Sequence, residues 1–127
     1  MKLLRYIEAC TEGDHRGPAW IARVEASRSG RTVYFDGRAL QASSGGGGPG
    51  NHYDLETGEP YWVSGVKRSG SNRHWAGAGV ILVEASAVDQ LLTITGAGAL
   101  DESRYRVIPD LRAANPRAFV ERFNEPL

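Results

Sequence analysis

The chain has 127 residues, of which 41% are hydrophobic and 24% are charged. This composition is ordinary for a globular protein and argues against the disordered and membrane classes, so we expect one domain over residues 1–127. The 15 basic and 15 acidic residues give a formal net charge of zero, whereas dedicated nucleic-acid binders usually carry an excess of Lys and Arg. A basic binding site must therefore be local to one part of the chain.

The first ten residues, MKLLRYIEAC, contain apolar side chains that Arg5 and Glu8 interrupt. They form neither a signal-like apolar run nor a spanning segment, although a short helix is compatible with them. Cys10 is the single cysteine of the chain, so neither an internal disulfide nor a cysteine-rich zinc site is supported. We therefore predict a cytoplasmic protein with no membrane segment.

The segment 19–42 has the pattern of a three-stranded meander. Residues 19–27, AWIARVEAS, alternate between two faces as a half-buried strand does. The turn RSGR follows, and the next apolar run contains Asp36 and Gly37. This pair accepts the positive φ angles of a tight hairpin turn. A second meander is predicted between residues 51 and 86, where Gly58 and Gly70 lie in polar turn clusters.

A helical period replaces the strand pattern after residue 86. Four residues recur at helical spacing: Val88, Leu91, Leu92 and Thr95. Ser86 is the predicted N-cap of this helix, and Gly96 is its predicted C-terminal cap. A last strand is predicted over residues 104–108, and a terminal helix is predicted to begin at Asn115 and Pro116. Residues 97–127 should thus form a C-terminal extension that packs on the sheet.

Together these elements predict an α+β fold: a small, strongly bent antiparallel sheet or SH3-like barrel, with one or two short helices near the C-terminus. Apolar residues in the inward phase of their segments should form the core. These are Trp20, Val24, Phe35, Val63, Ile81, Leu92 and Phe119.

The glycine-rich stretch GGGGPGNHYD invites comparison with phosphate-binding loops. A Walker loop needs a Lys and a Ser or Thr directly after its last glycine and then a helix, whereas Asn51, His52 and Tyr53 follow Gly50 here. Pro49 also removes one backbone N–H that a phosphate cradle would use. We therefore predict a flexible connection over residues 43–50.

Candidate catalytic groups follow this loop. If residues 51–56 are extended, His52, Asp54 and Glu56 share one face and offer an imidazole and two carboxylates for acid–base chemistry. The same face is equally compatible with the solvated side of a strand, and no metal or cofactor is predicted because a full ligand set is missing. The enzyme alternative places His52, Asp54 and His74 together on a phosphate or acyl substrate.

A basic and aromatic segment provides the candidate binding residues. No Asp or Glu occurs between residues 61 and 83, and cations beside aromatic rings suit a phosphate backbone with stacked bases. The predicted ligand-binding residues are Lys67, Arg68, Arg73, His74, Trp75, Trp62 and Tyr53. Alternatively, the tryptophans fill the core and the cations solvate a hairpin tip. A third possibility is a protein adaptor or inhibitor that uses exposed strand edges.

The segments AWIARVEASRSGRTVYFDGRAL, GNHYDLETGEPYWVSGVKRSG and NRHWAGAG resemble a family of small uncharacterised bacterial proteins sometimes labelled 1-deoxy-D-xylulose-5-phosphate synthase. The resemblance covers residues 19–96 and implies no catalytic residues. A thiamine diphosphate enzyme needs several α/β domains and a GDG motif, which this chain lacks. We therefore reject that label and favour a binding module for single-stranded nucleic acid or another phosphate-bearing ligand.

Overall fold

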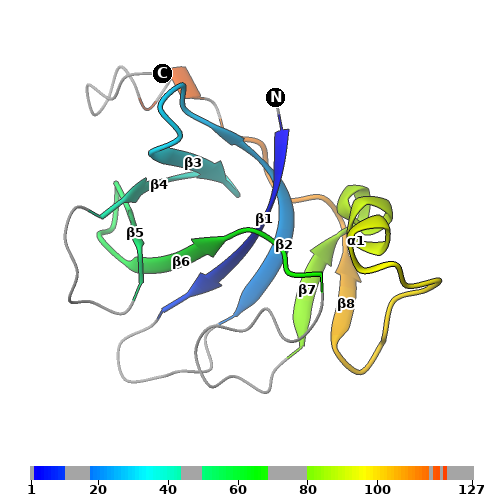
Figure 1. The fold of residues 1–127 in the computed structure, drawn as a ribbon. Coiled ribbons are helices and arrows are strands. Elements are labelled where there is room, and N and C mark those ends of the chain that lie inside the picture. Colours follow the sequence, from blue (N-terminus) through cyan, green and yellow to red (C-terminus); the bar gives the residue numbers. More distant parts are fainter. Residues whose placement is uncertain are drawn as a thin grey trace.

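The fold is built on a closed antiparallel β-barrel (Figure 1). The computed structural model describes residues 2–10, 18–43, 50–68, 80–114, 116, 117 and 119. The barrel strands are β1 (Lys2–Ala9), β2 (Ala19–Ala26), β3 (Thr32–Phe35), β4 (Arg38–Ala42), β5 (His52–Asp54) and β6 (Pro60–Ser64). They are ordered β1-β6-β5-β4-β3-β2, and pairing of β1 with β2 closes the ring. The predicted small bent barrel of the α+β class is confirmed.

An extension continues the sheet from one edge of β2 (Figure 1). It consists of β7 (Ile81–Glu84), a 3-10 turn η1 (Ala85–Ala87), α1 (Val88–Thr95) and β8 (Tyr105–Ile108). Strand β7 runs parallel to β2, and β8 runs parallel to β7. The predicted second meander is therefore only partly right, because β5 and β6 form a hairpin while β7 lies elsewhere. The edges of β6 are already occupied by β1 and β5.

Residues 2–9 form strand β1, so the short helix considered for the start of the chain is wrong. Tyr6 and Ile7 point to opposite faces of this strand and both are fully buried. Ile7 packs inside the barrel and Tyr6 packs in the cluster beneath α1. A strand that is buried on both faces shows no alternation of polar and apolar residues, which removes the usual sequence signal.

Two apolar clusters lie on the two sides of the barrel wall. The cluster inside the barrel contains Ile7, Ala22, Val24, Val33, Phe35, Leu40, Tyr61 and Val63. The second cluster joins β1, β2 and β7 to α1, where Leu91 is fully buried. Of the predicted core residues, those that are buried are Val24, Phe35, Val63, Ile81 and Phe119. Trp20 and Leu92 are only half-buried. For Leu92 the reason is that the face of α1 that meets the sheet is centred on Leu91.

Local signals at both the β3–β4 hairpin and the end of α1 are confirmed. Asp36 and Gly37 have φ angles of 47° and 73°, as a two-residue hairpin turn requires. Gly96 ends α1 with a φ of 72°. The predicted N-cap is wrong, because Ser86 lies within η1 and its backbone N–H donates to Asp110 Oδ1 at 2.9 Å. No helix in the described part of the chain is long and apolar enough to cross a membrane.

The chain after β8 returns to the β3–β4 hairpin. Arg112 donates from its backbone N–H to Asp36 Oδ1 at 3.3 Å, and its Nε lies 3.7 Å from the same oxygen. Further along, the rings of Phe119 and Tyr34 lie 5.9 Å apart. Residues 116, 117 and 119 have helical backbone, while Asn115, the predicted start of this helix, lies outside the described residues. Arg112 and Phe119, in the described residues after β8, therefore contact the barrel wall.

Candidate functional site

Strand β5 carries three of the predicted site residues on two faces. His52 is opposite Tyr61 on β6, and Asp54 is opposite Leu40 on β4, so both point toward the barrel interior. Tyr53 points outward, and its hydroxyl donates to Gln41 Oε1 at 2.9 Å. Because β5 lies on the side of the barrel away from α1 and β8, Tyr53 is not close to the extension (Figure 1).

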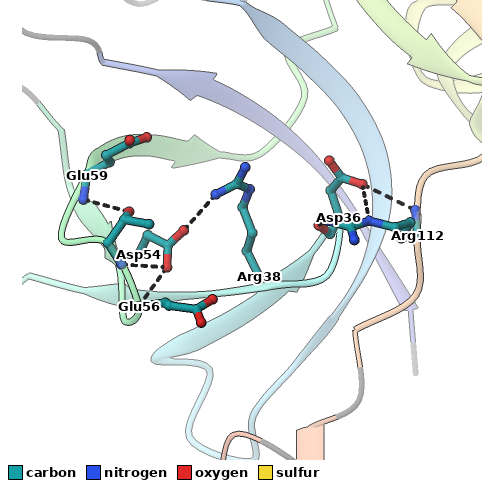
Figure 2. A network of polar contacts seen from close by, with 7 residues as sticks. Asp36, Arg38, Asp54, Glu56, Glu59 and Arg112 are labelled. Atoms are coloured by element: carbon teal, nitrogen blue, oxygen red, sulfur yellow. Dashed lines mark hydrogen bonds and ion pairs between the residues drawn. The ribbon is translucent and has the colours of Figure 1, made fainter.

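Asp54 holds the β5–β6 turn together (Figure 2). Its side chain is only 2% exposed, and Arg38 Nη1 donates to its Oδ2 at 3.0 Å. Its Oδ1 accepts the backbone N–H of Glu56 at 2.8 Å and that of Thr57 at 3.4 Å. These contacts are those of an Asx turn reinforced by an ion pair. They give Asp54 a structural function at this turn.

Of the three residues predicted to share a face, His52 and Asp54 do so, but Glu56 does not. Strand β5 ends at Asp54, and residues 55–57 form the turn. The side chain of Glu56 is consequently exposed and not aligned with the other two. Asp54 itself ends the strand, because its carboxylate binds the two N–H groups that would otherwise extend the ladder.

His52 is half-buried beside Asn51. Its Nδ1 lies 2.9 Å from Asn51 Oδ1, and burial lowers the pKa of His52 below its ordinary value. The amide of Asn51 also bonds to β6, because its Nδ2 donates to Val63 O and its Oδ1 accepts from Val63 N, each at 2.8 Å. Its predicted catalytic partner His74 lies outside the described residues, as do Arg73 and Trp75.

The last glycine of the glycine-rich stretch has a specific steric function. Gly50 has a φ of 149°, and a Cβ placed there would lie 2.5 Å from the carbonyl oxygen of Tyr61. Only glycine permits this close approach of two backbones. Residues 44–49 lie outside the described residues. Gly50 is therefore needed for the close packing of two backbone segments.

Lys67 and Arg68 follow β6 and line a small pocket against the extension. The pocket has a volume of about 140 Å³ and also includes Arg104, which begins the approach to β8. All three cationic residues are exposed. The sequence analysis missed Arg104, because it lies far along the chain from the acid-free segment and only the fold brings it beside Lys67 and Arg68.

The rest of this pocket is largely apolar. Leu91 and Leu92 come from α1, Leu100 comes from the segment that leads into β8, and Tyr105 is the first residue of β8. Asp101 is the one carboxylate in the lining. It is engaged with Ser103, whose backbone N–H and hydroxyl both donate to Asp101 Oδ1, and these hydrogen bonds lower its pKa. The pocket thus combines three cations with an apolar wall.

Trp62 of β6 packs against the apolar cluster beneath α1, which includes Leu91 of the pocket lining. Its side chain is half-buried. The aromatic ring that lines the pocket is Tyr105.

Glu84 is a buried carboxylate that the sequence analysis did not single out. It is 6% exposed and lies at the edge of β2 away from β1, between the pairings of that edge with β7 and with β3. Its Oε1 accepts the backbone N–H of Arg23 and its Oε2 accepts that of Leu111, each at 2.8 Å. A cavity of about 310 Å³ opens beside it, bounded by the chain after β8.

Within the described residues, no group of three or more His, Cys, Asp and Glu side chains could hold a metal ion. Comparisons with protein-family models, curated proteins and solved structures give no match to this chain.

Proposed function

We propose that the chain is a small cytoplasmic binding module for a phosphate-bearing ligand, which binds at the pocket lined by Lys67, Arg68 and Arg104. The observation that carries the proposal is the meeting of these three exposed cations around an apolar wall. The one carboxylate in the lining, Asp101, already accepts two hydrogen bonds from Ser103. An anion entering the pocket therefore meets a local excess of positive charge on a chain of zero net charge.

The size of the pocket restricts how the ligand binds. Pockets that enclose drug-sized ligands typically have volumes of roughly 300–1,000 Å³, and this one has about 140 Å³. It would receive one group of a larger ligand, such as a base or an acyl end against Leu100 and Tyr105, with phosphate at the cationic rim. Single-stranded nucleic acid and nucleotides have this combination of groups.

Arg73, His74 and Trp75 belong to the proposal on sequence grounds, because they continue the acid-free segment after Arg68. The contacts of Asp54 favour binding over the alternative of acid–base catalysis. Its carboxylate accepts hydrogen bonds from the turn and from Arg38, and these commit it to the fold. Tyr53 is not included, since it lies on β5, away from the pocket.

Salt dependence of binding tests the proposal. Each phosphate contact with a single strand contributes about −0.7 to the slope of log affinity against log salt, so three contacts predict a slope near −2. Arg68→Ala and Arg104→Ala should each make the slope shallower by about 0.7. Fluorescence anisotropy with a labelled single-stranded oligonucleotide measures this, and a nucleoside monophosphate in parallel separates recognition of the strand from recognition of one nucleotide.

Arg28→Ala is the matched control, because Arg28 is exposed in the β2–β3 turn and does not line the pocket. It should leave the slope unchanged. Equal losses in the Arg28, Arg68 and Arg104 variants would reduce the effect to general charge and contradict the proposal. Absence of binding at low salt and about micromolar protein would remove nucleic acid as the ligand.

A further inference from the structure

Closure of the barrel leaves the described sheet with one strand that is paired on a single side. Each barrel strand has neighbours on both edges, β7 lies between β2 and β8, and β8 is paired only with β7. In Figure 1 β8 forms the outer border of the extension, beside the chain that leaves α1. Among the described strands, β8 is thus the place where a further strand can be added.

The pairing register shows which backbone groups face outward. Ile81 donates its N–H to Arg104 O at 2.8 Å and is opposite Tyr105, while Val83 is opposite Val107. Backbone groups alternate between the two edges of a strand, so those of Arg106 face β7 and those of Val107 face away. Tyr105 N–H is held by Asp101 O at 2.9 Å. The outer edge therefore presents Tyr105 C=O together with the N–H and C=O of Val107.

The two faces of β8 differ in chemistry. Tyr105 packs on the cluster beneath α1, and Val107 continues the same face with 49% of its surface exposed. A groove of about 560 Å³ lies beside the strand, lined by the apolar residues Val88, Leu100 and Val107 and also by Glu102 and Arg106. Arg104 and Arg106 occupy the alternate phase of the strand and are exposed. A strand added at this edge would therefore contact apolar groups next to the Arg106 cation.

We propose that an extended segment of a partner protein, in which acidic and apolar residues alternate, adds to the outer edge of β8. Its apolar side chains would cover Val107 and enter the groove, and its carboxylates would lie beside Arg106, since side chains at paired positions of neighbouring strands interact directly. This surface is separate from the phosphate pocket, and Val107 and Arg106 do not line that pocket.

A second copy of the chain has more than one antiparallel register at this edge, because the outward-facing groups belong to Tyr105 and Val107. With Tyr105 opposite Val107, Arg106 falls opposite Arg106, and like charges at directly opposed positions are destabilising. With Val107 opposite Val107, Arg106 falls opposite Ile108 and gains no opposite charge. An acidic peptide supplies that charge, so charge complementarity favours it over self-association.

The test uses the full chain and a capped, fluorescent peptide of about nine residues in which Glu and Val alternate. We expect saturable binding by anisotropy, together with slowing of hydrogen exchange at the Val107 N–H by about tenfold. Arg106→Glu should weaken binding by about tenfold, and a peptide with Lys in place of Glu should recover the lost affinity. Glu102→Gln should tighten binding of the acidic peptide, because Glu102 is the carboxylate in the groove lining.

Three controls decide the outcome. Arg28→Glu, an exposed charge reversal in the β2–β3 turn, should bind the peptide as the parent chain does. The same peptide methylated on alternate backbone nitrogens should lose binding, because it cannot donate to the strand. Equal binding of the methylated peptide, equal binding of a peptide with Glu and Val in separate blocks, or no binding at about millimolar peptide overturns the proposal. Concentration-dependent dimers in sedimentation, with Val107 protected in the absence of peptide, would assign the edge to a second copy and also overturn it.

Discussion

Asp54 and Glu84 are two buried carboxylates that both accept backbone N–H groups, yet their donors lie at different distances along the chain. Asp54 binds the N–H groups of residues two and three positions ahead. Glu84 binds Arg23, which is 61 positions away, and Leu111, which is 27 positions away. The first carboxylate therefore shapes one turn, whereas the second joins the barrel, β7 and the returning chain at one point.

The two regions also differ in which parts of the chain must come together before each can form. The β5–β6 turn closes locally, and Arg38 adds an ion pair from the neighbouring strand. The junction at Glu84 exists only after β2, β7 and the chain beyond β8 have come together. Replacing each carboxylate therefore compares two contributions to the free energy of unfolding: that of the junction between the extension and the barrel, and that of the β5–β6 turn within the barrel.

The largest effect is expected for Glu84→Ala. It leaves the N–H groups of Arg23 and Leu111 without their acceptor and breaks the side-chain link between β2, β7 and the chain after β8, which should lower the free energy of unfolding by about 3 kcal/mol. Urea denaturation measures the change. Glu84→Gln keeps one acceptor oxygen and should lose less, and equal losses in both variants would show that the negative charge is what matters.

A smaller loss, of about 2 kcal/mol, is expected for Asp54→Ala, because the freed N–H groups belong to the exposed turn residues Glu56 and Thr57 and can reach water. Arg38→Ala removes only the ion pair and should cost about 1 kcal/mol, since the side chain of Arg38 is 37% exposed. The same urea experiments compare the two. If Asp54→Ala destabilises the protein more than Glu84→Ala does, the contrast between local and long-range carboxylates fails.

The smallest effect concerns His52. Burial lowers its pKa in the folded protein below the ordinary value of 6.5, so the unfolded chain binds more protons as the pH falls through that value. The stability that depends on neutral His52 is therefore fully present above this pH and decreases below it. Melting temperatures of the parent chain and His52→Gln, measured between about pH 8 and about pH 5, should converge at the acid end. Parallel curves would mean that His52 does not titrate differently on folding.

Features set by neighbours in the chain were predictable from the sequence. The Asp36–Gly37 turn and the end of α1 at Gly96 depend on backbone conformations that few residues adopt. The alternation in residues 19–26 identified β2 for a similar reason. In the candidate site, Lys67 and Arg68 were found because their segment lacks acidic residues. Each of these signals lies within about ten residues of the feature it specifies.

Features set by distant partners were not predictable in the same way. Strand β1 is buried on both faces, so its residues show no alternation. The parallel pairing of β7 with β2, and the approach of Arg104 to Lys67, depend on the way the chain crosses between strands. Glu84 looked like any surface glutamate at the end of an apolar strand. Asp54, by contrast, was noticed as a candidate acid but is committed to a turn, because a polar pattern does not distinguish capping from catalysis.

The position of β1 within the ring has a consequence for folding during synthesis. Strand β1 leaves the ribosome before the other described strands and finds β2 soon afterwards, but its other edge pairs with Tyr61–Ser64 of β6. The ring therefore closes only after β6 has been made. Until then the unpaired edge of β1, with the side chain of Ile7 beside it, is a template for pairing with other nascent chains. Closure of this kind is slow and joins distant segments. The speed of translation and the access of chaperones therefore determine how much of the protein reaches the native state.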